Sequence, residues 1–333
     1  MTNEVRNPRM SWLLLAGSLC WAASAGRADG PQKPVARPPL TIAAKVAGQP
    51  IYVAEVREEL DEVLKGRTLD EGARPRMLAQ MLSQLVDRRL VLEYLRALAQ
   101  AVDKTKVDAQ VGQLSAELKQ HGTALPAYLA ARGITEAALR EQISWRLSWK
   151  SYVERHVNDG RLEHYFETHR REYDGTRVRA SQILLPLPKD ADATAVDTVW
   201  KQATGLRKQI VAGTLSFDDA VAKHSTAPSK QHHGDLGWIA RHGAVPESVA
   251  TTVFALEAGQ LSEPVVTPFG VHLVKVTEIK PGAKTWRDVA EELQSAVVRR
   301  GFAKIAAEQR GKSPVEFTGA MPYFDPKTGM LKM

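Results

Sequence analysis

Apolar residues recur at intervals of three and four over much of this chain, which is the pattern of amphipathic helices. The longest example covers residues 74–100, where the charged residues Asp87, Arg88 and Arg89 are expected to face outward. Another helix is expected to begin near Val53, after a short apolar strand and a Gly turn. Further helices are predicted at residues 104–120, 124–132, 136–156, 161–176 and 286–307. The first half of the chain is therefore predicted to be largely helical.

The second half shows a different pattern, because short β-rich runs alternate with short helices. Residues 178–185 are rich in β-formers and end at Pro186, which is typical of a strand. Two more strands are predicted at residues 263–267 and 271–278, and helices at residues 192–213, from Ser216 onward, and at 246–259. This order of elements predicts an α+β domain with an antiparallel sheet.

Three large rings follow one another on the helix predicted at residues 136–156. Trp145, Trp149 and Tyr152 stand at i, i+4 and i+7 and therefore share one helical face. Most such stripes pack in a core. The alternative is a groove that binds extended client segments through large apolar rings.

The ends of the chain carry processing and linker signals. Residues 1–28 are typical of a secretory signal peptide, with a basic start, a short apolar stretch and an Ala-Ser-Ala cleavage site at residues 23–25. Cys20 lies inside this segment, so the exported chain is expected to contain no cysteine and no disulfide. Residues 29–40 form a Pro-rich linker, and residues 311–333 are expected to be an irregular tail.

The chain has a formal net charge of +7, which raises the question of nucleic-acid binding. However, the basic residues are scattered among acidic ones, as in Arg57-Glu58-Glu59, and no basic cluster alternates with stacking aromatics. The charge is therefore interpreted as a solvated basic surface rather than a nucleic-acid site.

Three separated motifs carry a resemblance to a known family. The chain contains Val178-Arg179-Ala180-Ser181-Gln182-Ile183-Leu184-Leu185, then His233-Gly234-Asp235-Leu236-Gly237-Trp238, then Thr267-Pro268-Phe269-Gly270-Val271-His272. In this order and spacing they resemble a parvulin-type peptidyl-prolyl isomerase domain. The resemblance covers about a third of the chain and implies the parvulin fold and catalysis of rotation about X-Pro bonds.

The beginning of the helical half resembles that of SurA-type chaperones and PrsA-type foldases. In those families a C-terminal segment packs back onto the N-terminal helical domain, and we expect the same here. The expected domains are a signal peptide (1–28), a linker (29–40), a helical chaperone domain (41–176), a parvulin-like domain (177–281), a returning C-terminal helix (282–310) and a tail (311–333).

The parvulin resemblance implies a set of polar catalytic residues. His272 matches the family's histidine on the last strand, and Thr267 matches the threonine that supports it. Gln182 replaces the partner histidine on the first strand, and a Gln amide can still donate and accept hydrogen bonds. Ala227 replaces the usual Asp or Cys of the loop, while Ser225 remains as a candidate polar residue beside it.

The resemblance also implies an apolar pocket for the proline ring. Leu236, Val245 and Val249 fall where the family lines this pocket, although Val249 stands where Phe is usual. Phe269 lies beside the site. Asp235 is interpreted as a carboxylate that forms the turn rather than as an acid catalyst.

These observations predict an exported folding chaperone that isomerises X-Pro bonds in unfolded or extended segments of exported proteins, in the periplasm or cell envelope. No cofactor, metal, nucleic acid or membrane span after signal cleavage is expected. The alternative is a chaperone or peptide-binding protein without catalysis, because Gln182, Ala227 and Val249 all depart from the family pattern.

Overall fold

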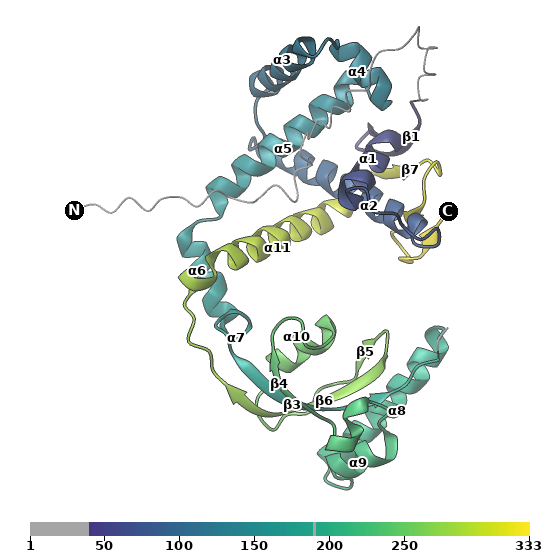
Figure 1. Cartoon of the computed structure of the whole chain (residues 1–333), viewed down its shortest axis with the longest axis vertical. Helices are drawn as coiled ribbons and strands as arrows, with labels where there is room; N and C mark the ends of the chain where they lie inside the picture. Colours follow the sequence, from purple (N-terminus) through teal and green to yellow (C-terminus); the bar gives the residue numbers. More distant parts are fainter. Residues whose placement is uncertain (1–39, 189–190) are drawn as a thin grey trace, which may run out of the picture. The chain divides into compact units, whose positions relative to one another are not determined.

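The computed structural model in Figure 1 describes residues 40–188 and 191–333. The predicted signal peptide and nearly all of the Pro-rich linker lie outside the described residues. The chain divides into two compact units: a helical unit, which runs to His156 and resumes over Val298–Met333, and a sheet unit, Val157–Val297. The α+β class predicted from the sequence is confirmed. No helix among the described residues combines the length and apolar character that crossing a membrane requires.

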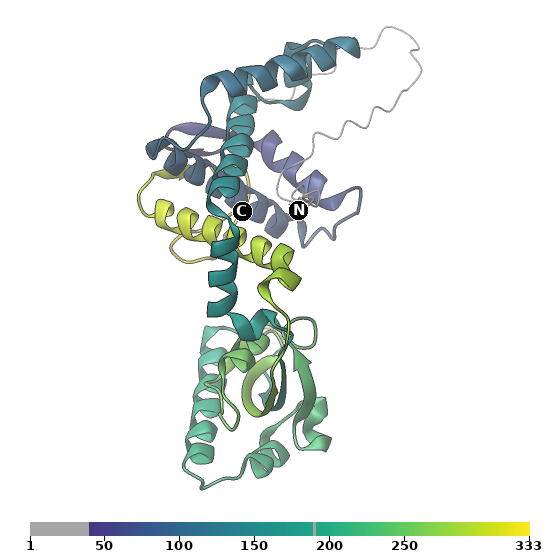
Figure 2. The ribbon, with the colours of Figure 1, turned by 90° about the vertical axis from the view of Figure 1, so that its left-hand side faces the viewer.

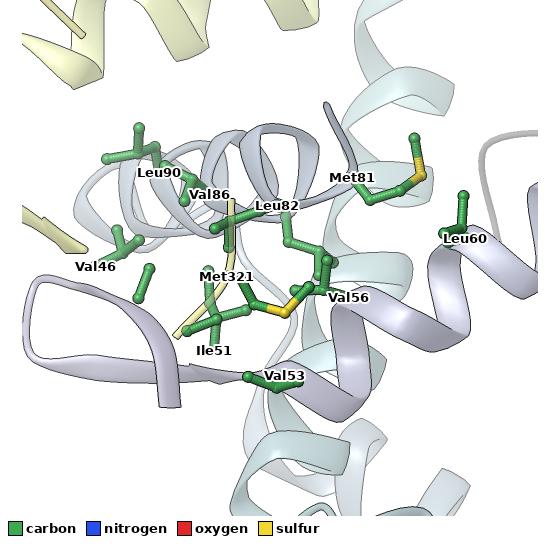
Figure 3. Packing of buried hydrophobic residues seen from close by; sticks show 13 residues of the cluster. Val46, Ile51, Val53, Val56, Leu60, Met81, Leu82, Val86, Leu90 and Met321 are labelled. Atoms are coloured by element: carbon green, nitrogen blue, oxygen red, sulfur yellow. The ribbon is translucent and has the colours of Figure 1, made fainter. Parts of the chain in front are cut away.

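Among the described residues, the helical unit contains five complete helices, the end of a sixth helix and two small sheets. Its elements are β1 (Ile42–Val46), β2 (Gln49–Tyr52), α1 (Val53–Leu64), α2 (Arg74–Ala97), α3 (Lys104–Gln120), α4 (Leu125–Arg132), α5 (Glu136–His156), β7 (Val315–Phe317), β8 (Tyr323–Phe324), β9 (Leu331–Lys332) and the latter half of α11 (Ala290–Arg310). Ile51, Val56 and Met321 gather around Leu82 of α2 to form its main apolar core (Figure 3).

The tail predicted to be irregular is instead partly ordered as strands. β7 pairs antiparallel with β1, which gives a sheet of order β2-β1-β7. The ring of Phe317, the last residue of β7, stacks on the ring of Tyr323 in β8, with the ring centroids 4.3 Å apart. The prediction was wrong because it relied on Gly and Pro content, whereas the unpaired edge of β1 provides hydrogen bonds that the tail satisfies.

Arg89 is buried, although we expected it to face outward. It is only 6% exposed, and its Nη2 lies 3.0 Å from Oε2 of Glu55 on α1. Glu55 also accepts hydrogen bonds from the Tyr52 N–H and from the Gln142 side chain of α5. Burial raises the pKa of the Glu55 carboxyl, and the charge of Arg89 lowers it only in part. This face of α2 is covered because α1 and α5 both pack against it.

The aromatic stripe on α5 takes part in core packing. Trp145 and Trp149 stack with centroids 5.5 Å apart, and the ring of Phe302 on α11 meets both edge-on. The stripe packs against a buried cluster that includes Leu95 and Ile305. The core alternative therefore accounts for these rings, and they hold the end of α11 within the helical unit.

The sheet unit contains the predicted strand and helix pattern. Its elements are α6 (Asp159–Thr168), α7 (Arg170–Tyr173), β3 (Arg177–Leu185), α8 (Ala193–Val211), α9 (Phe217–His224), η2 (Pro228–His232), β4 (Asp235–Ala240), α10 (Glu247–Ala255), β5 (Val265–Thr267), β6 (Gly270–Lys280), η3 (Trp286–Val289) and the start of α11. The sheet has the order β4-β3-β6-β5, and all neighbouring strands are antiparallel (Figures 1 and 2).

The single helix predicted over residues 161–176 is two helices, α6 and α7, separated at His169. Leu162 and Phe166 of α6 pack against Trp286 and Leu293. The compact sheet unit consequently begins at Val157 and ends at Val297, whereas we expected the parvulin-like domain to span 177–281. The difference arises because the residues flanking the sheet pack on each other.

The two faces of the sheet are covered by different helices. Ile183 and Leu273 pack with residues of α8 and α9. On the other face, Ala180 and Val274 pack with residues of α10, among them Val249. This alternation follows from the two-residue period of a strand, and it determines which side chains share the candidate site.

Candidate functional site

The strand register brings the polar candidates onto one face of the sheet. Gln182 pairs with Val274, and His272 pairs with both Leu184 and Val265. Residues directly opposite each other on neighbouring strands point to the same face. Val274 belongs to the cluster under α10, so Gln182 and His272 share that face. Thr267, two residues after Val265, lies there too.

The three polar residues are joined by short hydrogen bonds through the imidazole ring. Nδ1 of His272 lies 2.9 Å from Oε1 of Gln182, and Nε2 lies 2.8 Å from Oγ1 of Thr267. His272 is only 4% exposed. Burial lowers the pKa of its imidazole below the ordinary value of 6.5, so the ring is neutral at pH 7.

Thr267 also shapes the turn between β5 and β6. Its hydroxyl oxygen accepts a hydrogen bond from the Phe269 N–H at 3.1 Å and lies 3.2 Å from the Gly270 carbonyl oxygen. The side chain of Phe269 is 68% exposed. A large apolar ring therefore stands open to solvent two residues away from the network's threonine.

The three predicted pocket residues belong to one apolar cluster under α10. Leu236 and Val245 are half-buried, whereas Val249 is only 1% exposed and lies within the core. Sequence reasoning missed Val274, which belongs to the same cluster and pairs with Gln182. Counting in steps of two along the last strand from His272 could have found it.

The loop before β4 extends the edge of the sheet. The Gln182 N–H donates to the Gly234 carbonyl at 2.9 Å, and the Thr226 N–H donates to the Leu184 carbonyl at 2.9 Å. The Ser225 hydroxyl oxygen accepts from the Leu184 N–H at 3.1 Å and from the Ala227 N–H at 3.3 Å. The loop is thus hydrogen-bonded to β3 where β4 no longer pairs with it. The hydroxyl oxygen of Ser225 accepts hydrogen bonds from two backbone N–H groups.

Asp235 forms the turn, as predicted. Its Oδ1 accepts from the Gly237 N–H at 2.8 Å, and its Oδ2 lies 2.9 Å from Nη2 of Arg179. The hydrogen bond from Arg179 is the main cause that lowers the pKa of this carboxyl. An ionised carboxylate with these partners positions the chain rather than supplying a proton.

Gly234 is the position where the loop comes closest to β3. Its φ is +81°, and a Cβ there would lie 2.5 Å from the Gln182 carbonyl oxygen. We expect Gly234→Ala to cost about 1–2 kcal/mol for the left-handed conformation and about 1–3 kcal/mol more for the collision. Urea unfolding of the sheet unit measures this loss.

Gly237→Ala is the matched control, because Gly237 also has a positive φ, +68°, but nothing lies within 4 Å of its added Cβ. It should show only the conformational cost of about 1–2 kcal/mol. Equal losses in the two variants would show that the close approach of the loop does not matter.

The helical unit contains a separate surface hollow between α3 and α5. It has a volume of about 380 Å³ and is lined by Val102, Lys106, Ala109, Gln110, Leu147, Lys150, Ser151 and Glu154. Its lining combines apolar side chains, such as Leu147, with the charged side chains Lys106, Lys150 and Glu154. None of the candidate catalytic residues belongs to it.

Comparison with known proteins identifies two domains in the chain. Residues 12–152 match a SurA-like N-terminal domain, and residues 183–278 match a PPIC-type PPIASE domain. The foldase protein PrsA of Bacillus subtilis is 28% identical over 179 residues, which are 53% of this chain and 54% of that protein. The chaperone SurA of Dechloromonas aromatica is 27% identical over 296 residues, which are 84% of this chain and 65% of that protein.

Among solved structures, the peptidylprolyl isomerase PrsA from Bacillus anthracis is 21% identical to this chain. The alignment covers 70% of this chain and 96% of the other, with a TM-score of 0.35. The chain spans between 54% and 65% of the length of the curated relatives described above.

Proposed function

We propose that this chain, which joins a SurA-like N-terminal domain to a PPIC-type isomerase domain, is a folding chaperone that also isomerises X-Pro bonds. Its clients would be unfolded or extended segments of exported proteins. We propose the periplasm or cell envelope as its place of action, because residues 1–28 are typical of a signal peptide.

The observation that carries the proposal is that a neutral polar network and an apolar cluster share one face of the sheet. Gln182, His272 and Thr267 are hydrogen-bonded to one another, and Val274 connects their face of the sheet to the cluster with Leu236 and Val245. Prolyl isomerisation must overcome a barrier of about 18–20 kcal/mol from the loss of amide resonance. Apolar surroundings and oriented polar groups can favour the twisted amide without a nucleophile.

The alternative is a chaperone whose isomerase domain binds peptides without catalysis. Two observations favour it. Ala227 places no polar side chain in the loop, and Val249 is buried in the core instead of opening onto a surface pocket. Both hypotheses predict binding of extended apolar segments, and they differ only in turnover.

A proline-limited refolding assay with the purified protein separates the two hypotheses. We expect acceleration at catalytic amounts, and a loss of about 10–200-fold in kcat/KM for Leu236→Ala, because the variant removes apolar contact with the proline ring. Trp200→Ala is the control, since Trp200 is an exposed residue on α8, the helix that packs on the opposite face of the sheet.

No acceleration by the wild-type protein, combined with suppressed aggregation at stoichiometric amounts, would support the chaperone without catalysis. Equal losses for Leu236→Ala and Trp200→Ala would contradict the proposed location of the proline pocket.

A further inference from the structure

The hydrogen bonds around His272 determine where its proton lies. A neutral imidazole carries one N–H, and its other nitrogen can only accept. In the structure the group facing Nδ1 is the side-chain oxygen of Gln182, which cannot donate. The N–H must then be on Nδ1, and Nε2 must accept the hydroxyl proton of Thr267, whose oxygen lies 2.8 Å away.

Thr267 can serve as that donor without losing its own support. Its oxygen already accepts the Phe269 N–H at 3.1 Å, and its single proton can point to only one partner. The Gly270 carbonyl oxygen at 3.2 Å is the other candidate acceptor, at a longer distance than Nε2 of His272. The shorter contact favours the bond to the imidazole.

From this geometry we infer that Gln182 holds His272 as the neutral Nδ1–H tautomer. The Thr267 hydroxyl then donates to Nε2 of His272, and the Nδ1–H of His272 donates to the side-chain oxygen of Gln182. Gln182 is then a positioning residue. Any effect of this tautomer on catalysis rests on the proposed isomerase function. The tautomer itself can be tested without catalysis, because it can be observed directly.

Among the described residues, the groups bonded to the ring carry no charge that would oppose this state. Its partner from β3 is the Gln182 amide and its partner from β5 is the Thr267 hydroxyl, and neither is titratable near neutral pH. On β6 the next residues on the same face are Gly270 and Val274, and the loop residues bonded to β3 are Ser225, Thr226 and Gly234. Burial alone accounts for the lowered pKa of His272, with no contribution from a charged group.

The functional consequence is a site that works in one protonation state. A histidine at position 182 could exchange protons with His272, whereas the amide of Gln182 cannot titrate. We therefore expect the pH profile of kcat/KM for prolyl isomerisation to show no step at pH 6.5, the ordinary histidine pKa.

The test is long-range ¹H–¹⁵N NMR of the imidazoles in the full-length protein, with His272 assigned by comparison with His272→Gln. The wild-type ring should show the Nδ1–H pattern, unchanged as the pH passes through 6.5, the ordinary histidine pKa. In Gln182→Met, which keeps the length of the side chain but not its oxygen, the single tautomer should be lost. A folded state can be verified by the unchanged amide spectrum of the sheet core.

Gln182→Glu provides the opposite change. A carboxylate beside Nδ1 favours the imidazolium and raises the pKa of His272. The ring then donates from both nitrogens, and the Thr267 hydroxyl must turn its proton to the Gly270 carbonyl. We expect this variant to protonate His272 within the pH range where the wild type stays neutral, and its kcat/KM to become pH-dependent.

An Nε2–H pattern in the wild type would overturn the inference, as would a mixture of tautomers or protonation of His272 near pH 6.5, the ordinary value. So would an unchanged tautomer in Gln182→Met. These readouts are independent of turnover. If the refolding assay detects no isomerisation but the Nδ1–H pattern is present, the proposed activity fails while the assignment of the network stands.

Discussion

Replacing Arg89 with Met is expected to lower the free energy of unfolding of the helical unit by about 3–5 kcal/mol at pH 7. The variant leaves Glu55, which is 1% exposed, without the cation that lies 3.0 Å from its carboxylate. Removing one partner of a buried pair costs more than the pair contributes, because the remaining charge is still desolvated. Hydrogen exchange in α1 and α2 measures the effect separately from the sheet unit.

The pH dependence of this loss has a definite sign. Burial already raises the folded-state pKa of Glu55 above its ordinary value of 4.5, and loss of Arg89 raises it further. An acid whose pKa is raised in the folded state stabilises the fold at pH values below its unfolded-state pKa. This stabilisation is lost as the pH rises through the folded-state pKa. The deficit of Arg89→Met relative to wild type should therefore be largest at neutral pH and shrink toward pH 4.5.

Arg140→Met is the matched control. Arg140 pairs with Asp108 and Glu136 at the surface of the same unit, where exposed pairs contribute about 0–1 kcal/mol. Its loss should be correspondingly small. If Arg89→Met proved no more destabilising than Arg140→Met, the Glu55–Arg89 pair could not be the buried link between α1 and α2 that the structure shows.

Ala227→Asp is expected to increase kcat/KM for prolyl isomerisation by about 10²–10³-fold, on the assumption that one polar group near the twisting amide acts like one oxyanion-hole group. Ala227 lies in the loop that is hydrogen-bonded to β3 beside Gln182. In the parvulin family that this domain resembles, the matching position is usually an Asp or a Cys. The same refolding assay measures the change.

The control for this variant is Ala227→Val, which adds bulk without a polar group and should give no gain. Val249→Phe is not a suitable companion, because Val249 is 1% exposed and a larger ring there would overpack the core at a cost of about 1–3 kcal/mol. Ala227 is itself only 3% exposed, so both Ala227 variants are first checked for a native fold. An Ala227→Asp variant that folds but is no faster than wild type would argue against Ala227 as the missing polar position.

The sequence was sufficient to predict much of the sheet unit. The strand predicted at residues 178–185 is β3, Arg177–Leu185, and the helix predicted at 192–213 is α8, Ala193–Val211. These elements have strong local signals, such as the Asp192 side chain that caps α8. The polar candidates Gln182, Thr267 and His272 were named from the resemblance to parvulins, and their side chains are in hydrogen-bond contact in the structure.

Other features could not be predicted, because they depend on which surfaces meet. Nothing near Arg89 in the sequence indicates that α1 and α5 cover it. Residues 315–317 become a strand only because β1 offers them an edge, and Ser225 is engaged with the backbone only because its loop lies beside β3.

The sequence by itself determined the order of helices and strands, the polar and apolar composition of the candidate site and the family that its motifs resemble. Local propensity and the two-residue period of strands are enough for the elements, and the resemblance of the motifs to parvulins supplied the rest. The tertiary structure alone decided which charge is buried, which tail residues pair and which side chains form hydrogen bonds with His272. Those properties arise from burial and from hydrogen bonds between residues distant in the chain, which no local pattern records.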